Sequence, residues 1–161
     1  MKHYLIDLDD TIFINKDKRR INYSLIQSDP QLVQLLDMIK VPKYIYTNAT
    51  FEHANVVLNQ MGIDTKFKKI YSRDTMPLMK PHLNSAIDVE NNIRYWGYNN
   101  KYNHSFYFFD DLLNNLKMGK NQRWTTIWIS PHYRKVDYYD YVDYAFPDIK
   151  SALAYLNKYN L

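Results

Sequence analysis

The sequence contains no cysteine, and this absence removes several kinds of chemistry. Without a thiol the chain has no disulfide framework, no thiolate zinc site and no cysteine nucleophile. Long apolar runs are absent as well, since no stretch of the sequence approaches the roughly 20 residues that a membrane-spanning helix needs. The N-terminal residues lack the apolar core of a signal peptide. We therefore expect an intracellular, cytoplasmic protein with no membrane partner.

Size and composition are those of an ordinary globular protein. The chain has 161 residues, of which 46% are hydrophobic and 24% charged, and its formal net charge is +4. This balance favours a folded chain over a disordered one, and the length predicts a single domain over residues 1–161. Basic residues are scattered apart from two short runs, 16–20 and 66–69. Charge alone therefore does not predict nucleic-acid binding.

Short apolar segments alternate with segments of helical spacing. Five segments read as buried strands, namely 4–8, 44–47, 69–72, 106–109 and 126–129. Five read as helices, namely 31–39, 51–61, 82–89, 112–117 and 148–159, with Gly62 and Gly119 as two of the expected helix ends. This alternation predicts an α/β fold of three layers, in which helices cover both faces of a central parallel sheet. Residues 91–103 and 130–143 are expected as surface loops.

Polar side chains stand at the ends of the predicted strands, where parallel sheets bind their ligands. Asp7 and Asp9 are two positions apart in an extended segment, so both can point into one crevice. One carboxylate can attack phosphorus and form an aspartyl phosphate, while the other donates a proton to the leaving oxygen and later activates water. With Asp110 they form a hard-oxygen site suited to Mg²⁺. Thr47 and Lys80, with the backbone near Asn48, can hold phosphate oxygens.

Four segments resemble the motifs of the haloacid dehalogenase (HAD) superfamily, and they follow one another in the order expected of that superfamily. These segments are Asp7-Leu8-Asp9-Asp10-Thr11, Tyr46-Thr47-Asn48, Met79-Lys80-Pro81 and Phe108-Phe109-Asp110-Asp111. Each one stands at the end or flank of an expected element, and together they span most of the chain. The resemblance implies a Rossmann-like sheet in which the strand before Asp7 lies between the strands that end at Thr47 and Asp110.

The resemblance also implies a role for each matching residue. Asp7 is expected as nucleophile and metal ligand, and Asp9 as general acid/base that binds Mg²⁺ through its carbonyl oxygen. Asp110 is expected to bind the metal. The remaining matches are expected to hold phosphate (Thr47, Asn48 and Lys80), to lie close behind the metal ligands (Asp111) and to brace the first loop (Thr11). The dehalogenase branch lacks an acid at the position of Asp9, because halide needs no proton donor. Phosphoryl transfer is therefore favoured over dehalogenation.

A narrower resemblance points to the pyrimidine 5′-nucleotidase branch. It is carried by Tyr46-Thr47-Asn48-Ala49, His53-Ala54, Val57-Leu58, Gly62-Ile63 and Lys80-Pro81-His82, together with the fourth motif. Members of that branch usually carry a helical cap between the first and second motifs. Here residues 12–43 separate the motifs, and much of this stretch is needed for the helix that joins two parallel strands. We therefore expect only a small flap over residues 12–28.

Three functions remain open. The first is a phosphomonoesterase for a nucleotide or small phosphorylated metabolite, and the second is a phosphatase for a phosphoprotein or a nucleic-acid terminal phosphate. The third is a non-catalytic binding module. The basic run 16–20 is either a solvated turn or an element that steers the substrate. The five histidines lack metal-ligand spacing, so none is assigned chemistry. Asn114 and Asn115 are expected as polar residues on a helix surface.

Overall fold

A six-stranded parallel sheet forms the centre of the protein, which is described by a computed structural model over residues 1–16, 20–97 and 103–161. The strand order is β3-β2-β1-β4-β5-β6. The strands are β1 (Lys2–Ile6), β2 (Lys43–Tyr46), β3 (Ile70–Tyr71), β4 (Ser105–Asp110), β5 (Thr125–Ile129) and β6 (Tyr144–Phe146). The predicted position of β1, between β2 and β4, is confirmed.

Strand β1 is buried on both faces because its side chains alternate between two cores. Tyr4 and Ile6 belong to one apolar cluster, whereas Leu5 belongs to the other. Ile6 pairs with Ile45 of β2 and with Phe109 of β4. A nearly continuous apolar run is what a central parallel strand requires, because neither of its faces meets water.

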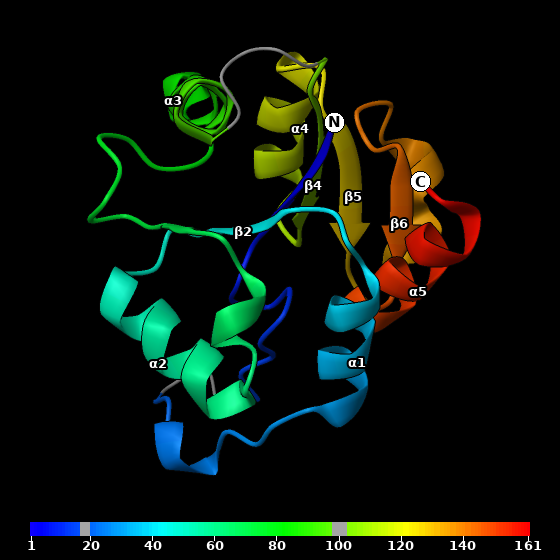
Figure 1. Ribbon diagram of the computed structural model, residues 1–161. Coiled ribbons are helices and arrows are strands. Elements are labelled where there is room, and N and C mark those ends of the chain that lie inside the picture. The colour runs from blue at the N-terminus through cyan, green and yellow to red at the C-terminus, as the bar shows by residue number, and fades with distance from the viewer. Residues whose placement is uncertain (17–19, 98–102) are drawn as a thin grey trace.

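Helices cover both faces of the sheet, as the sequence predicted (Figure 1). Residues of α1 (Pro30–Met38), α2 (Phe51–Met61) and α5 (Ile149–Tyr159) pack in the cluster that contains Ile6. Residues of α3 (Leu83–Asn92) and α4 (Leu113–Asn121) pack in the cluster that contains Leu5. The fold is therefore the three-layer α/β architecture that the alternating pattern predicts.

Local signals fix the ends of the helix that matters most for the site, α2. The hydroxyl of Thr50 accepts a hydrogen bond from the His53 N–H, which caps the first turn. Gly62 ends the helix with φ 71°, in the left-handed region that glycine adopts without a steric penalty. Thr47 and this capped helix start are only three residues apart, so the second motif leads directly into a rigid element.

Two of the expected loops and one expected helix end differ from the prediction. Residues 130–143 contain a 3-10 helix, Tyr133–Tyr138, and β6 (Tyr144–Phe146) begins directly after residue 143. Within 91–103, α3 extends to Asn92 and a π-helix covers Ile93–Gly97, while 98–102 lie outside the described residues. Gly119 lies inside α4 instead of ending it. A Cβ at this position would be 2.8 Å from Phe108 Cδ1, so Gly119 is needed for close helix–sheet packing.

The flap segment, residues 12–28, lies between β1 and α1. It begins at a tight turn in which the Asp10 N–H donates to the Phe13 carbonyl at 2.7 Å, and Asp10 has φ 59°. Its 3-10 helix η1 (Tyr23–Leu25) packs against α2. Residues 17–19 of the basic run fall outside the described residues. Across the described ranges, no helix has the length and apolar character that crossing a membrane requires.

The buried His3 of β1 predicts a loss of stability in acid. Its ring stacks on His104 and Phe106, with centroid distances of 5.1 Å to each. Burial and the neighbouring His104 lower the pKa of His3 from 6.5 to about 4. Below pH 6.5, His3 therefore binds a proton in the unfolded chain but stays neutral in the folded chain. This difference destabilises the fold as pH falls from 6.5 towards 4. Between pH 7.5 and pH 5 the loss is about 2 kcal/mol.

Denaturant unfolding at these two pH values measures the effect. Between pH 7.5 and pH 5, the wild type should lose about 2 kcal/mol more of its free energy of unfolding than a His3→Phe variant loses. A His132→Gln variant, changed at an exposed histidine, should keep the wild-type pH dependence. Equal pH dependence in wild type and His3→Phe would show that His3 does not carry the effect.

Candidate active site

The predicted site residues meet at the carboxyl ends of three neighbouring strands. Asp7 follows β1, Thr47 follows β2 and Asp110 is the last residue of β4. Lys80 enters from the long connection between β3 and α3. Asp7, Thr47 and Lys80 border a cleft of about 350 Å³, and Asp110 is buried behind them. The cleft is lined by Asp7, Asp9, Asp10, Thr47, Asn48, Ala49, Lys80, Asp111, Leu112 and Asn115. Polar groups from distant parts of the sequence thus converge where an open parallel sheet binds its ligand.

A buried ammonium group joins two buried carboxylates at the base of this cleft. Lys80 Nζ donates to Asp7 Oδ1 at 2.7 Å and to Asp110 Oδ2 at 2.6 Å. It also lies 5.1 Å from the ring centroid of Tyr46 and 5.5 Å from that of Phe108. Burial by itself would lower the pKa of Lys80, but Asp110 and Asp7 outweigh it and raise that pKa above its usual range. Lys80 therefore stays charged.

One ammonium group cannot neutralise all the acids around it. Burial raises the pKa of Asp7 to about 7, with help from the charges of Asp110 and Asp111 and against the opposing effect of Lys80. Burial and the charge of Asp110 likewise raise the pKa of Asp111 to about 6. The clustered carboxyl groups repel one another and are partly dehydrated, so the site favours the approach of a cation.

Asp110 is held in place by hydrogen bonds from the start of α4. Asn115 Nδ2 donates to both of its carboxylate oxygens, at 3.0 and 3.1 Å, and the Leu112 N–H donates to Oδ1 at 2.9 Å. The expectation that Asn115 lies on a helix surface is wrong, because it is only 3% exposed. The fourth motif runs directly into α4, and this connection turns position 115 towards the acid that precedes the helix.

The remaining motif residues, Thr11, Asn48 and Thr47, form hydrogen bonds with neighbouring groups of the site. Thr11 Oγ1 lies 3.4 Å from Asp7 Oδ2. The Asn48 side chain donates to the Lys80 carbonyl at 2.8 Å and accepts from the Lys80 N–H at 3.0 Å. Asn48 therefore fixes the backbone that carries Lys80, which the sequence did not reveal. Thr47 is buried, and its hydroxyl oxygen accepts from the Ala49 N–H at 3.1 Å.

Asp9 has a partner that sequence reasoning missed. His53, in the first turn of α2, places Nε2 2.8 Å from Asp9 Oδ1. The other ring nitrogen of His53 lies 2.8 Å from the hydroxyl of Tyr23 in the flap segment. In the sequence, His53 was marked by the nucleotidase-like resemblance and by its place, six residues after Thr47 at the start of the following helix, but neither signal assigned it a partner. That position brings it to the same end of the sheet as the acids.

The acidic cluster fits a hard divalent cation. Within the described ranges, Asp7, Asp110 and Asp111 each offer a carboxylate oxygen, and these oxygens lie within 4.8 Å of one another. Mg²⁺ prefers oxygen ligands and usually keeps several water molecules, so three clustered acids, of which Asp7 and Asp111 line an open cleft, match its requirements. Asp9 is not in this group. Its side chain is bound to His53, which leaves its backbone carbonyl as the group that the resemblance assigns to the metal.

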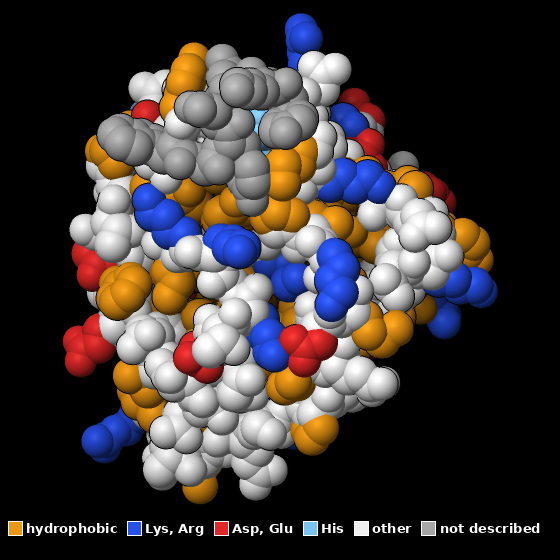
Figure 2. Space-filling model, viewed as in Figure 1, with side chains coloured by type: hydrophobic (Ala, Val, Ile, Leu, Met, Phe, Trp, Pro, Cys, Tyr) orange, Lys and Arg blue, Asp and Glu red, His pale blue; other side chains and the backbone are white. Residues whose placement is uncertain are grey.

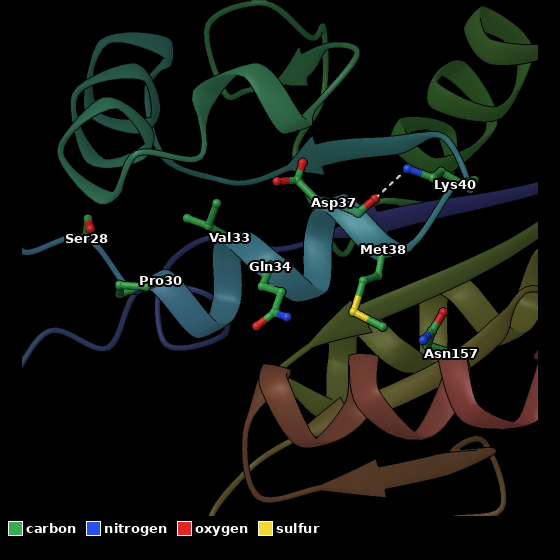
Figure 3. A pocket seen from close by; sticks show the side chains of 8 residues that line it. All are labelled: Ser28, Pro30, Val33, Gln34, Asp37, Met38, Lys40 and Asn157. Carbon is green, nitrogen blue, oxygen red and sulfur yellow. Dashed lines mark hydrogen bonds between the residues drawn. The ribbon is translucent and has the colours of Figure 1, made fainter.

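Among the described residues, the hollow beside α1 and the basic side chains on the surface do not combine clustered acids with a buried lysine as the motif cleft does. A wider hollow of about 820 Å³ lies on the outer side of α1 near α5 (Figure 3). Its one lysine, Lys40, donates to the Asp37 carbonyl at 2.8 Å, and none of the motif residues lines it. Basic side chains on the face seen in Figure 2 are interspersed with apolar and neutral groups. We therefore place the candidate active site at the motif cleft.

Comparison with known proteins identifies the fold through structure alone. Neither the family models nor the curated proteins include a match to the chain. Among solved structures, the L-2-haloacid dehalogenase of Xanthobacter autotrophicus is 15% identical with a TM-score of 0.61, covering 83% of this chain and 62% of that one. The HAD hydrolase YfnB of Bacillus subtilis, bound to magnesium, is 19% identical with a TM-score of 0.62, covering 77% and 52%.

A third similar structure is a predicted phosphoglycolate phosphatase of Haemophilus somnus. It is 18% identical with a TM-score of 0.60, and the match covers 78% of this chain and 56% of that one. The present chain thus spans 52 to 62% of the length of these three proteins. Dehalogenases and phosphatases both occur among the similar structures, so the likeness identifies the architecture and not the reaction. The chain has the Rossmann-like α/β fold of the HAD-superfamily hydrolases.

Proposed function

We propose that this protein is a Mg²⁺-dependent phosphomonoesterase that acts through an aspartyl phosphate on Asp7. The observation that carries this proposal is the Lys80 ammonium group that joins Asp7 and Asp110 beneath a cleft whose wall includes Asp9. A buried cation fixes the nucleophile, and a second, more exposed acid lies within the same cleft. Two carboxyl groups in different environments are suited to two different roles in one reaction.

In the first step, a carboxylate oxygen of Asp7 attacks phosphorus while the bond from phosphorus to the leaving oxygen breaks. Protonated Asp9 gives its proton to that leaving oxygen, which departs as an alcohol. The Lys80 ammonium and the Thr47 hydroxyl hold the phosphoryl oxygens. Asp7, Asp110, Asp111 and the Asp9 carbonyl would hold Mg²⁺, which would supply positive charge opposite the phosphoryl oxygens.

In the second step, a water molecule attacks the phosphorus of the aspartyl phosphate. Asp9, now a carboxylate, accepts the proton of this water as the bond between phosphorus and Asp7 breaks. The products are inorganic phosphate and a free Asp7. Asp9 is the residue that favours this reaction over dehalogenation, because an alkoxide leaving group needs a proton and a halide does not.

For the substrate, we propose a nucleotide or another small phosphorylated metabolite. The nucleotidase-like residues around Thr47 and Lys80 support this choice. A specific observation favours a second candidate, a phosphoprotein or nucleic-acid terminal phosphate. In this proposal residues 1–161 form one domain, and the flap segment stands where larger relatives carry a cap. Such a short flap leaves the 350 Å³ cleft accessible to phosphate on a bulky molecule.

Phosphate release tests the proposal. The protein should release inorganic phosphate from at least one class among nucleoside monophosphates, sugar phosphates, phosphopeptides and phosphorylated oligonucleotides. Release should stop when EDTA removes the metal and return when Mg²⁺ is added in excess. Preference for free nucleotides would support the first substrate class, and preference for peptides or oligonucleotides the second. Folded protein with Mg²⁺ that releases phosphate from none of them would favour the binding module.

A further inference from the structure

We propose that His53 and Tyr23 position the acid/base Asp9, so that the flap segment contributes to the chemistry of the cleft. This inference rests on the proposed function, because it needs Asp9 to transfer protons. The observation is a chain of two hydrogen bonds that runs from the Tyr23 hydroxyl to His53 Nδ1, and from His53 Nε2 to Asp9 Oδ1. Each of them is 2.8 Å long. These two hydrogen bonds connect three elements, namely the turn after β1, α2 and η1.

The chemistry of the three groups fixes the direction of the hydrogen bonds. Asp9 Oδ1 accepts when the carboxyl group is ionised, and it also accepts when the proton lies on the other oxygen, so in both forms that the reaction uses the bond to Asp9 requires a hydrogen on His53 Nε2. In the neutral ring Nδ1 is then an acceptor, and the Tyr23 O–H can donate to it. A phenol partner therefore selects the tautomer that presents its N–H to Asp9. This assignment follows from the hydrogen-bond network, which offers each group a matching partner.

His53 is more buried than Asp9, which suits it to the role of the residue that fixes the other. The His53 side chain is 13% exposed, whereas the Asp9 side chain is 42% exposed and faces the cleft. His53 stands on a capped helix, in which its backbone N–H donates to Thr50 Oγ1 at 3.3 Å. Asp9 by contrast lies on a tight turn beside water, where a carboxyl group has several rotamers available. A fixed donor on a rigid helix limits that freedom.

Holding Asp9 matters for both steps of the reaction. A proton can reach the leaving oxygen only if the carboxyl group lies within hydrogen-bond distance of it, and misplacement by about 1 Å can cost about 100-fold in rate. The bond to His53 also keeps this carboxyl apart from the metal-binding group of Asp7, Asp110 and Asp111. His53 is thus a positioning residue, and Tyr23 supports it from the flap.

The dependence of rate on the leaving group tests this role. In a His53→Ala variant, kcat/KM for a nucleoside monophosphate, or for whichever alkyl phosphate the wild type cleaves best, should fall about 10- to 100-fold. With p-nitrophenyl phosphate, whose leaving group needs little protonation, kcat/KM should change little. His53→Gln, whose side-chain amide can donate to Asp9, should recover part of the lost rate. Tyr23→Phe, which keeps the ring but loses the hydroxyl, should show a smaller loss of the same kind.

The controls separate positioning from folding and from the proposed function itself. His132→Gln and Tyr138→Phe change exposed residues of the same types and should match the wild type. If the wild type cleaves neither substrate, the proposed function fails. If it cleaves both, and His53→Ala has no effect or lowers both rates equally, the positioning role is wrong. If His53→Ala does not fold, the same comparison is made with His53→Gln and Tyr23→Phe, and equal rates on both substrates relative to wild type would overturn the inference.

Discussion

An Asp7→Asn variant should lose phosphate release by at least about 10⁴-fold while it remains folded. The amide is nearly the same size as the carboxylate but cannot attack phosphorus, and loss of a covalent nucleophile costs several orders of magnitude. The fold should tolerate the change. Burial raises the pKa of Asp7 to about 7, so its charged form destabilises the metal-free protein above that pH, and the neutral amide removes this cost. The asparagine oxygen can still accept from Lys80.

Initial rates of phosphate release and thermal unfolding of the metal-free protein, both at pH 7.5, measure the two parts of this prediction. Asp140→Asn is the matched control, since it makes the same chemical change at an exposed position, and it should keep wild-type activity. An active Asp7→Asn variant would remove Asp7 from the role of nucleophile. An inactive variant that is also unfolded would leave Asp7 as a structural residue.

A Lys80→Met variant should lose both stability and activity. Methionine fills similar space but leaves the carboxyl groups of Asp7 and Asp110 buried without their cation. Removing one partner of a buried ion pair costs about 3–5 kcal/mol, and loss of a charged group that holds the phosphoryl oxygens costs about 10²- to 10³-fold in rate. Lys80 lowers the pKa of Asp7, so its removal favours the protonated acid. The loss of stability should therefore be larger at pH 7.5 than at pH 5, where Asp7 takes up a proton.

Denaturant unfolding of metal-free protein at the two pH values gives this difference directly. Lys117→Met, on the exposed face of α4, is the matched control and should change the free energy of unfolding by less than about 0.5 kcal/mol. If Lys80→Met were as stable as this control at pH 7.5, the ammonium group would not be offsetting buried negative charge. If it were unstable to the same extent at both pH values, the loss would come from packing.

The sequence predicted the convergence of the acids with Thr47 and Lys80 because two simple regularities decide it. Apolar strands buried on both faces must lie in a parallel sheet, and polar residues that follow such strands gather at one edge. Lys80 lies 73 positions from Asp7, yet its place after the third strand brings it to the same edge. The strand order that puts β1 in the centre came from the motif resemblance, since apolar patterns alone do not rank the strands.

The residues that support the acids could not be predicted in the same way. His53 meets Asp9 across 44 positions, and Asn48 meets Lys80 across 32. Such hydrogen bonds depend on how a side chain leaves its helix or turn, and they produce no periodic pattern. Asn115 has the sequence context of a surface residue, and only the turn from β4 into α4 reveals that it is buried. Strand β6 was missed because its three residues are too few to give an alternating pattern.

The central claim is that Asp7 carries the phosphoryl group during turnover. The most direct test is to mix wild-type protein, Mg²⁺ and excess substrate, quench within the first turnovers in acid, and measure the mass of the protein and of its peptides. We expect part of the protein to gain the mass of one phosphoryl group, on the peptide that contains Asp7, and Asp7→Asn to gain none. Turnover in the wild type without any phosphorylated protein, or with the label on another residue, would contradict the mechanism.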